Sequence, residues 1–213
     1  MTEDADKIAL ADGKRLFSRS ISFVTGALSE ETLPLTRYPE LAFAGRSNVG
    51  KSSLINALVG QRQLARVSNT PGRTQEINFF ELGNRLMLVD LPGYGYAQAP
   101  KDKAVVWATF IRRFLKGRTQ LRRALVLIDS RHGIKPHDED IMKLMDESAV
   151  NYQVVLTKID KIKPAELASC HAAVSEAIAK HVAAHPTVLA TSAAEGTGLP
   201  ELRAALSELA LPE

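Results

Sequence analysis

Residues 45–52 have the types and spacing needed to bind a phosphate group. They read Gly-Arg-Ser-Asn-Val-Gly-Lys-Ser, which matches the pattern Gly-x-x-x-x-Gly-Lys-Ser/Thr. The two glycines let the backbone curl until successive N–H groups point at phosphate oxygens. In this pattern Lys51 would reach the β- and γ-phosphates, and the Ser52 hydroxyl would hold Mg²⁺. The predicted chemistry is nucleotide binding, and the alternative interpretation is a glycine turn that caps an ordinary helix.

A second candidate loop closes an apolar run, and residues 90–93 read Asp-Leu-Pro-Gly. A carboxylate at the carboxyl end of a strand would lie beside the phosphate loop of a parallel sheet, so Asp90 can hold Mg²⁺ there. The Gly93 amide can meet a γ-phosphate, so this loop would respond to the presence of that phosphate. Many nucleotide switches place Gln directly after this glycine to orient the attacking water. Tyr94 occupies that position here, so slow hydrolysis is expected.

Two later loops predict which base is bound. Residues 157–160 read Thr-Lys-Ile-Asp, and Asp160 can accept hydrogen bonds from both N1–H and the 2-amino group of guanine. Adenine lacks that donor pair, and sites built on such pairing discriminate by about 10⁴-fold or more. The stem of Lys158 would lie over the base. Residues 191–193 read Thr-Ser-Ala, and the Ala193 N–H can donate to guanine O6. Each loop alone could be a solvated turn, and their order along the chain favours the guanine interpretation.

The segment 61–75 would have to supply a further Mg²⁺ ligand. It shows no clear periodicity, and a Pro-Gly pair within it is typical of a loop. Its hydroxyl side chains are Ser68, Thr70 and Thr74, and their chemistry alone does not choose between them.

Alternating apolar runs and helical patterns would position these loops. Strands are predicted at 40–44, 76–82, 85–90, 124–129, 152–157 and 187–190, and helices from near Lys51 and at 103–115, 137–147, 164–182 and 199–209. The pair Gly83-Asn84 predicts a tight hairpin, which makes its two strands antiparallel. The expected fold is therefore α/β, with a mostly parallel six-stranded sheet, one antiparallel edge strand and helices on both faces.

The chain is expected to hold a single domain over residues 17–213, preceded by a mobile extension at 1–16. Residues 16–27 are expected to lie extended against that domain. Of the 213 residues 45% are hydrophobic, which is ample for one core. No linker or internal repeat divides the domain, and no heptad pattern argues for an obligate dimer, so a monomer is expected.

The only cysteine is Cys170, so no disulfide framework can form, which fits a reducing compartment. The amino-terminal residues lack a signal-peptide pattern, and no apolar run approaches the length of a membrane span. We therefore expect a cytoplasmic protein without a membrane partner.

The net charge of +3 hides an uneven distribution, because residues 103–128 contain no acid. This basic window is a candidate electrostatic footprint for nucleic acid, and the alternative is a solvated helix end and loop. Its basic residues are Lys103, Arg112, Arg113, Lys116, Arg118, Arg122 and Arg123.

Together, the motifs GRSNVGKS, TPGRTQEINFF, DLPGYGYA, TKID and TSA resemble the EngB (YihA/YsxC) family of bacterial GTPases, in the Era-like translation-factor class. The resemblance covers residues 17–210. It implies the P-loop GTPase fold, with Thr74 as the second Mg²⁺ ligand in a guanine-nucleotide loop from Gly72 to Glu76. Family members often have Leu, Lys or Thr where this chain has Glu76.

The resemblance also implies a role in assembly of the large ribosomal subunit, with the subunit or its rRNA as partner through residues 103–123. An older association with cell division leaves an alternative, a GTP-dependent switch that recruits proteins for septum formation without contacting RNA. A P-loop kinase is disfavoured, because the loops 157–160 and 191–193 would have no use in it. The candidates for catalytic help are Arg73, a bound partner and a K⁺ ion near Asn48, and the alternative role of Asn48 is a plain hydrogen bond within its own loop.

The predicted ligands are GTP or GDP and Mg²⁺, the predicted catalytic residues are Lys51, Thr74 and Gly93, and the predicted metal ligands are Ser52, Thr74 and Asp90. The residues predicted to contact the nucleotide are Gly45, Arg46, Ser47, Asn48, Val49, Gly50, Lys51, Ser52, Gly72, Arg73, Thr74, Gln75, Glu76, Asp90, Leu91, Pro92, Gly93, Thr157, Lys158, Ile159, Asp160, Thr191, Ser192 and Ala193.

Overall fold

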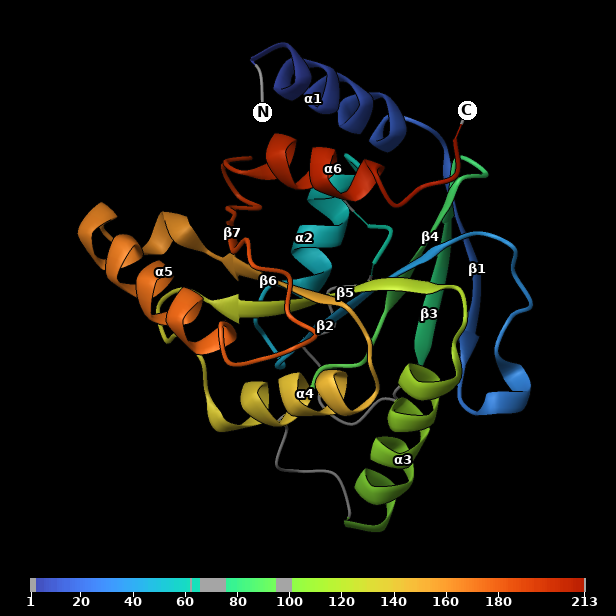
Figure 1. The fold of residues 1–213 in the computed structure, drawn as a ribbon. Helices are drawn as coiled ribbons and strands as arrows, with labels where there is room; N and C mark the ends of the chain where they lie inside the picture. The colour runs from blue at the N-terminus through green and yellow to red at the C-terminus, as the bar shows by residue number, and fades with distance from the viewer. Residues whose placement is uncertain (1–2, 62, 66–75, 95–100, 213) are drawn as a thin grey trace.

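The structure, a computed structural model, describes residues 3–61, 63–65, 76–94 and 101–212, with the backbone alone at Glu3 and 101–108. Its strands form one seven-stranded sheet in the order β1-β3-β4-β2-β5-β6-β7 (Figure 1). Their bounds are β1 Ile21–Ala27, β2 Glu40–Gly45, β3 Ile77–Leu82, β4 Leu86–Asp90, β5 Leu121–Asp129, β6 Tyr152–Thr157 and β7 Leu189–Ala190.

The predicted α/β fold with a mostly parallel sheet is confirmed, but the sheet has seven strands and not six. β2 pairs in parallel with β4 and β5, and β6 pairs in parallel with β5 and β7. β3 runs against its neighbours β1 and β4, so the antiparallel strand lies one place in from the edge. The sequence does not mark residues 21–27 as a strand, because only Ala27 of this edge strand is buried.

The predicted hairpin between β3 and β4 is confirmed. Gly83 and Asn84 both have φ of 56°, and the Arg85 N–H donates to the Leu82 carbonyl at 3.1 Å. Two successive left-handed residues form the type I′ turn, whose twist matches that of paired strands.

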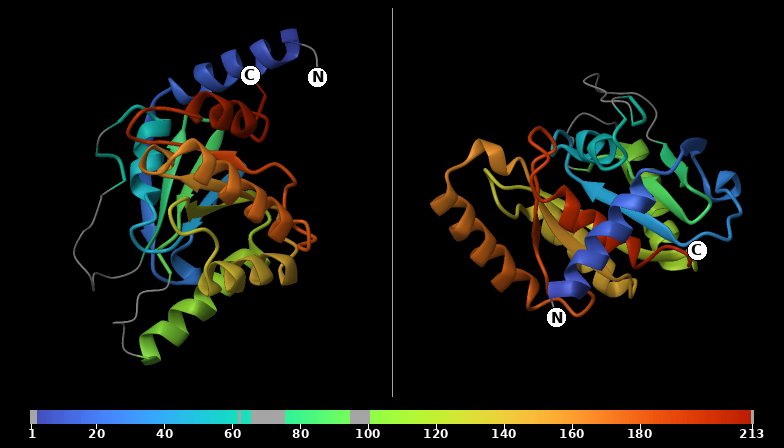
Figure 2. Two further views of the ribbon diagram at one scale, coloured as in Figure 1. Left: turned by 90° about the vertical axis from the view of Figure 1, so that its left-hand side faces the viewer. Right: turned by 90° about the horizontal axis from the view of Figure 1, so that it is seen from above.

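The helices cover the sheet in two layers, and each layer has its own apolar core. Residues of α3, α4 and α5 pack on one face, and residues of α1, α2 and α6 pack on the other (Figures 1 and 2). The helix bounds are α1 Glu3–Phe17, α2 Lys51–Leu58, α3 Lys101–Gly117, α4 Pro136–Glu147, α5 Pro164–Ile178 and α6 Leu199–Ser207, with 3-10 turns η1 Glu30–Thr32 and η2 Ile159–Lys161. Within the described ranges, no helix combines the length and the apolar character that spanning a bilayer requires.

The amino-terminal segment differs from the expected mobile extension. Glu3–Phe17 forms helix α1, which lies along α6, and its last residues Leu16 and Phe17 are buried. The two helices approach most closely at Gly13, where an added Cβ would lie 2.5 Å from the Ala204 backbone nitrogen. The buried contact is short, because Gly13, Leu16 and Phe17 are buried while Ile8 and Leu10 of the same helix are exposed, which is why the sequence of this segment suggested a solvated extension.

Replacing Gly13 with Val should force α1 away from α6. The added side chain meets backbone atoms that cannot move aside, so we expect the free energy of unfolding to fall by about 2 kcal/mol. Hydrogen exchange of the α1 amides should accelerate as well. The matched control is Ala11→Val on the exposed face of α1. Equal effects of the two substitutions in urea denaturation would contradict this packing.

Candidate functional site

Four of the loops predicted to bind nucleotide lie at one edge of the sheet. They follow β2, β4, β6 and β7, and in the sheet order these strands are neighbours or are separated only by β5. The strands are parallel, so their carboxyl ends meet at the same edge, where ligands of open α/β sheets bind. The fold therefore brings together segments that are more than a hundred residues apart in the chain.

The loop after β2 turns directly into helix α2, as its motif predicts. Gly50 is the residue before the helix and has φ of 104°, a conformation that favours glycine. Lys51 and Ser52 then open the helix, whose N-terminal N–H groups carry a partial positive charge. The ammonium of Lys51 contacts the carboxylate of Asp90 at the end of β4, and each side chain is only 11% exposed. The structure thus joins the first two predicted loops through a buried ion pair.

Backbone contacts join the same two loops. The Tyr94 N–H donates to the Gly45 carbonyl at 3.2 Å, and the Ser47 N–H donates to the Tyr94 carbonyl at 3.1 Å. Gly93 lies so close to Ser47 that an added Cβ would be about 3.0 Å from the Ser47 Oγ. A side chain at position 93 would push the loops apart, so a movement of either loop is transmitted to the other.

The Tyr94 side chain is directed at helix α4. Its hydroxyl donates to Asp138 Oδ1 at 2.9 Å, and Asp138 Oδ2 accepts the Lys135 N–H at 2.9 Å. Burial, followed by the neighbouring carboxylate, raises the pKa of Tyr94 well above its usual value. The phenol therefore stays protonated and engaged with Asp138.

Replacing Tyr94 with Phe should destabilise the link to α4. Asp138 is almost fully buried, and it would lose one of its donors, so the free energy of unfolding should fall by about 2 kcal/mol. The control is Tyr38→Phe, because the Tyr38 hydroxyl bonds the exposed Asn84 side chain at 3.2 Å. That control should change stability by less than about 0.5 kcal/mol. Thermal unfolding of both variants measures the difference, and a smaller loss for Tyr94→Phe than for the control would contradict the account.

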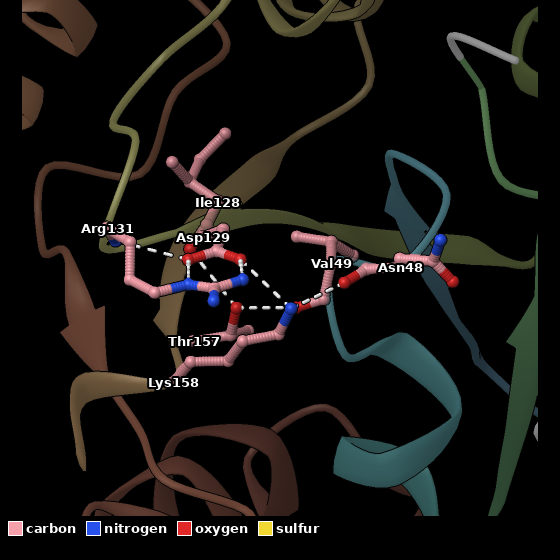
Figure 3. A network of polar contacts seen from close by, with 7 residues as sticks. All are labelled: Asn48, Val49, Ile128, Asp129, Arg131, Thr157 and Lys158. Carbon is pink, nitrogen blue, oxygen red and sulfur yellow. Dashed lines mark hydrogen bonds and ion pairs between the residues drawn. The ribbon is translucent and has the colours of Figure 1, made fainter. Parts of the chain in front are cut away.

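The loop after β6 is attached to the phosphate-loop motif (Figure 3). Thr157 Oγ1 donates to the Val49 carbonyl at 2.7 Å, and Lys158 Nζ donates to the Asn48 carbonyl at 2.5 Å. The aliphatic stem of Lys158 passes over Gly50, where an added Cβ would lie 3.5 Å from Lys158 Cε. Lys158 therefore connects the predicted loop after β6 to the predicted loop after β2.

Asp160 lies in η2, and neighbouring side chains favour the ionised form of its carboxylate, which accepts hydrogen bonds. Its Oδ1 accepts the Ser192 hydroxyl at 2.7 Å, and its Oδ2 lies 3.0 Å from Lys161 Nζ. The hydrogen bond from Ser192, followed by the one from Lys161, lowers the pKa of Asp160 below its usual value. The Ile159 N–H also bonds the Thr191 carbonyl at 3.3 Å, so the loops after β6 and β7 form one unit.

Comparison with known proteins agrees with this geometry. The family model described as 50S ribosome-binding GTPase matches residues 40–158. A probable GTP-binding protein EngB of Rhodospirillum rubrum is 57% identical over 209 residues, 96% of this chain and 90% of the relative. One from Rhodopseudomonas palustris strain BisB18 is 54% identical over 211 residues, 98% of each chain. This chain belongs to the EngB family of GTP-binding proteins.

Solved structures support the same assignment. The crystal structure of a probable GTP-binding protein engB is 25% identical, covers 80% of this chain and 97% of its own, and gives a TM-score of 0.65. A structure of Era in complex with MgGDPNP and nucleotides 1506–1542 of 16S ribosomal RNA is 23% identical, covers 84% and 59%, and gives a TM-score of 0.64. The second likeness shows a shared P-loop GTPase fold, and the resemblance to EngB proteins is confirmed.

The EngB motifs do not account for every residue at this edge of the sheet. Asp129 ends β5 and Arg131 follows it, and their side chains form an ion pair at 2.7 Å beside Lys158. Sequence reasoning missed both residues. A usable signal was present, because Asp129 is a polar residue at the end of an apolar run, and β5 lies between β2 and β6, which both lead into predicted nucleotide loops.

Part of the predicted site lies outside the described residues, namely Gly72, Arg73, Thr74 and Gln75, while Glu76 is described and immediately precedes β3. Among the described residues, no group of three or more His, Cys, Asp or Glu side chains could hold a metal ion. The predicted ligands Ser52 and Asp90 lie within the described residues at two of these loops, and a hydroxyl and a carboxylate are hard oxygen ligands that suit Mg²⁺.

Proposed function

We propose that this EngB-family protein is a GTP-dependent switch in assembly of the large ribosomal subunit, and that it hydrolyses GTP slowly. The observation that carries the guanine assignment is the pair of joined loops at Asp160 and Ser192, which present an ionised carboxylate on the same loop as Lys158, whose ammonium bonds the phosphate-loop motif. The proposed domain is one G domain, and the proposed location is the cytoplasm, where such subunits are assembled.

In this proposal the N–H groups of residues 45–52 and the Lys51 ammonium bind the phosphates. Asp160 accepts from N1–H and the 2-amino group of guanine, Lys158 covers the base and the Ala193 N–H donates to O6. Gly93 meets the γ-phosphate. Because Gly93 abuts Ser47 and Tyr94 bonds the same loop, the presence of that phosphate would be felt at Asp138 and helix α4.

Ser52 and Asp90 would hold Mg²⁺, with Thr74 as a further proposed ligand outside the described residues. The ion would neutralise charge on the β- and γ-phosphates. The Lys51–Asp90 contact fits this arrangement, because an incoming phosphate offers Lys51 a new anion and releases the Asp90 carboxylate.

Slow hydrolysis is supported by the engagement of Tyr94 with Asp138, which leaves no glutamine equivalent next to Gly93. Catalytic help from Arg73, from a bound partner or from K⁺ near Asn48 stays a prediction. Turnover in KCl and in NaCl at equal ionic strength tests the K⁺ hypothesis, and equal rates would end it.

The structure separates the described cations of the basic window into two that are bonded within the fold and others that are exposed. Arg118 is largely buried and binds both carboxylate oxygens of Glu40, at 2.6–3.1 Å, and Arg123 bonds Asn151 and Gln153. These two cations stabilise the fold and are poor candidates for RNA contact. The side chain of Lys103 lies outside the described residues. Among the described side chains, the exposed remainder consists of Arg112, Arg113 and Lys116 on α3 and Arg122 on β5, and we call it the α3 basic surface.

Two residues of the α3 basic surface have weak acidic partners. Arg112 lies 3.8 Å from Glu147 and Arg113 lies 3.4 Å from Glu30, and all four side chains are at least 43% exposed. Exposed pairs of this kind contribute little stability, so a phosphate backbone could displace the acids at small cost. The surface therefore supports an RNA partner, as does the description of the matching family model.

Co-sedimentation with ribosomal subunits tests this function. Loaded with a non-hydrolysable GTP analogue, the protein should pellet with the large subunit at low salt and lose the interaction at high salt, because phosphate contacts release counterions. Loaded with GDP, it should stay in the supernatant. Replacing Arg112, Arg113 and Lys116 together with Glu should abolish pelleting without changing GTP affinity.

The control reverses the same amount of charge at Lys7, Lys14 and Lys180, on α1 and after α5, and should pellet normally. If neither nucleotide state pellets, the ribosomal proposal fails. In that case the second candidate function, a protein-recruiting switch in cell division without RNA contact, is favoured, because the nucleotide site would still be intact.

A further inference from the structure

Asp129 is the centre of a polar network beside the nucleotide loops (Figure 3). Its Oδ1 accepts the Arg131 Nε–H at 2.9 Å and the Arg131 backbone N–H at 3.1 Å. Its Oδ2 accepts Arg131 Nη2 at 2.7 Å and lies 2.9 Å from Lys158 Nζ. The carboxylate is only 8% exposed, so these charged donors stabilise it where little water reaches. Burial raises the pKa of Asp129, but the bonds from Arg131 and Lys158 outweigh it and hold the pKa far below its usual range.

Lys158 is held in a conformation that needs such support. Its φ is 59°, and the φ of Asn48, whose carbonyl it contacts, is 64°. Left-handed backbone is disfavoured for residues other than glycine and persists where the surroundings impose it. The bond from Lys158 Nζ to the Asn48 carbonyl joins these two residues, and Asp129 is the anion that balances the ammonium in that position.

The two partners of the Asp129 carboxylate, Arg131 and Lys158, contact it in different ways. Arg131 binds both carboxylate oxygens in the two-pronged geometry that fixes an orientation, and its own side chain is 41% exposed. Lys158 contacts one oxygen only and extends from it across Gly50 to the P-loop. Arg131 therefore orients the carboxylate, and the carboxylate orients the lysine. None of the EngB motifs includes Asp129 or Arg131.

We propose that Asp129, oriented by Arg131, is a positioning residue that fixes Lys158 across the P-loop and thereby slows the release of guanine nucleotide. Asp129 acts through Lys158 and does not itself touch the nucleotide. The proposal rests on the proposed role of Lys158 at the base, and its test separates a failure of that role from a failure of the positioning.

The test is a double-mutant cycle on the release of a fluorescent GDP, followed by stopped flow in excess unlabelled GDP. Asp129→Asn keeps the shape and an acceptor for Arg131 but removes the charge that holds Lys158. It should accelerate release about tenfold, the effect of one charge-assisted hydrogen bond. Lys158→Ala should accelerate release at least as much. In the double variant, the Asp129 change should accelerate GDP release by less than a further factor of about two, because Asp129 acts through Lys158 and that side chain is already removed.

Two further variants separate positioning from general stability. Asp146→Asn is the matched control, because Asp146 is also largely buried and bonds a basic side chain, His181, at 2.6 Å, but belongs to α4. It should leave release unchanged. Arg131→Ala changes a partly exposed residue and should accelerate release about threefold, since the carboxylate keeps Lys158 but loses its orientation.

Each outcome of these release measurements either supports or contradicts the positioning role of Asp129. If Asp129→Asn releases GDP at the wild-type rate, or accelerates release by the same factor with and without Lys158, the positioning role is overturned while the base site stands. If Lys158→Ala itself leaves release unchanged, the assignment of Lys158 to the base fails, and the role of Asp129 fails with it. A non-additive cycle with an unaffected Asp146 variant supports the proposal.

Discussion

Asp160→Asn is expected to lower the affinity for GDP by about 10³-fold or more, the largest change that a single conservative substitution should produce in this protein. In the proposed site the carboxylate would accept from two guanine donors at once, and the amide would replace one acceptor with a donor that faces the 2-amino group. Loss of the Ser192 and Lys161 partners of the charged carboxylate adds to the effect. Competition against a fluorescent GDP measures the loss.

The same variant should gain affinity for xanthosine diphosphate. Xanthine carries a carbonyl where guanine carries the 2-amino group, so the new amide donor is paired again. Asp140→Asn is the control, because that carboxylate is 70% exposed on α4 and should leave both affinities unchanged. A variant that loses GDP and xanthosine diphosphate equally would indicate a folding defect, and one that loses neither would remove Asp160 from the base site.

Lys51→Ala should lower the rate of GTP hydrolysis by about 10²–10³-fold, because in the proposed site the ammonium would be the cation aimed at the charge that develops on the phosphates. It should also destabilise the protein without nucleotide. Asp90 would keep its largely buried position and lose its partner, which typically costs about 3–5 kcal/mol. Single-turnover hydrolysis and thermal unfolding measure the two effects separately.

Lys143→Ala, which removes an exposed ammonium from α4, is the matched control and should change neither quantity. Asp90→Asn in the Lys51→Ala background should restore part of the stability, since no uncompensated charge is then left, while hydrolysis stays low. Full hydrolysis by the Lys51 variant would contradict the assignment of the phosphate site.

Most of the strands that sequence reasoning located are buried on both sides. The runs that became β2, β4, β5 and β6 are buried along nearly their whole length, so they appear as continuous apolar stretches. The residues of β1 do not appear as a continuous apolar stretch, because this edge strand exposes Phe23 and Val24 and buries few side chains. α1 differs from the expected mobile extension for a related reason, since its buried residues are few and include Gly13, Leu16 and Phe17 near its carboxyl end.

The candidate site was predicted where several residues share a motif and a place in the chain order. The single polar contacts between distant segments were not predicted: Tyr94 with Asp138, Asp129 with Lys158, and Arg118 with Glu40. Each involves one residue from each segment, so no spacing signals it. Such pairs follow from the tertiary fold, and they decide which cations of the basic window remain at the surface.

The central claim is that the loops after β2, β4, β6 and β7 form one guanine-nucleotide site, and competition binding to the wild-type chain tests it most directly. Fluorescent GDP bound in the presence of Mg²⁺ would be displaced by unlabelled GDP, GTP or ATP. We predict that GDP and GTP compete at similar low concentrations and that ATP needs about 10⁴-fold more. Displacement by ATP at the same concentration as GTP would contradict the account, because it would leave Asp160 and Ser192 without a role at the base.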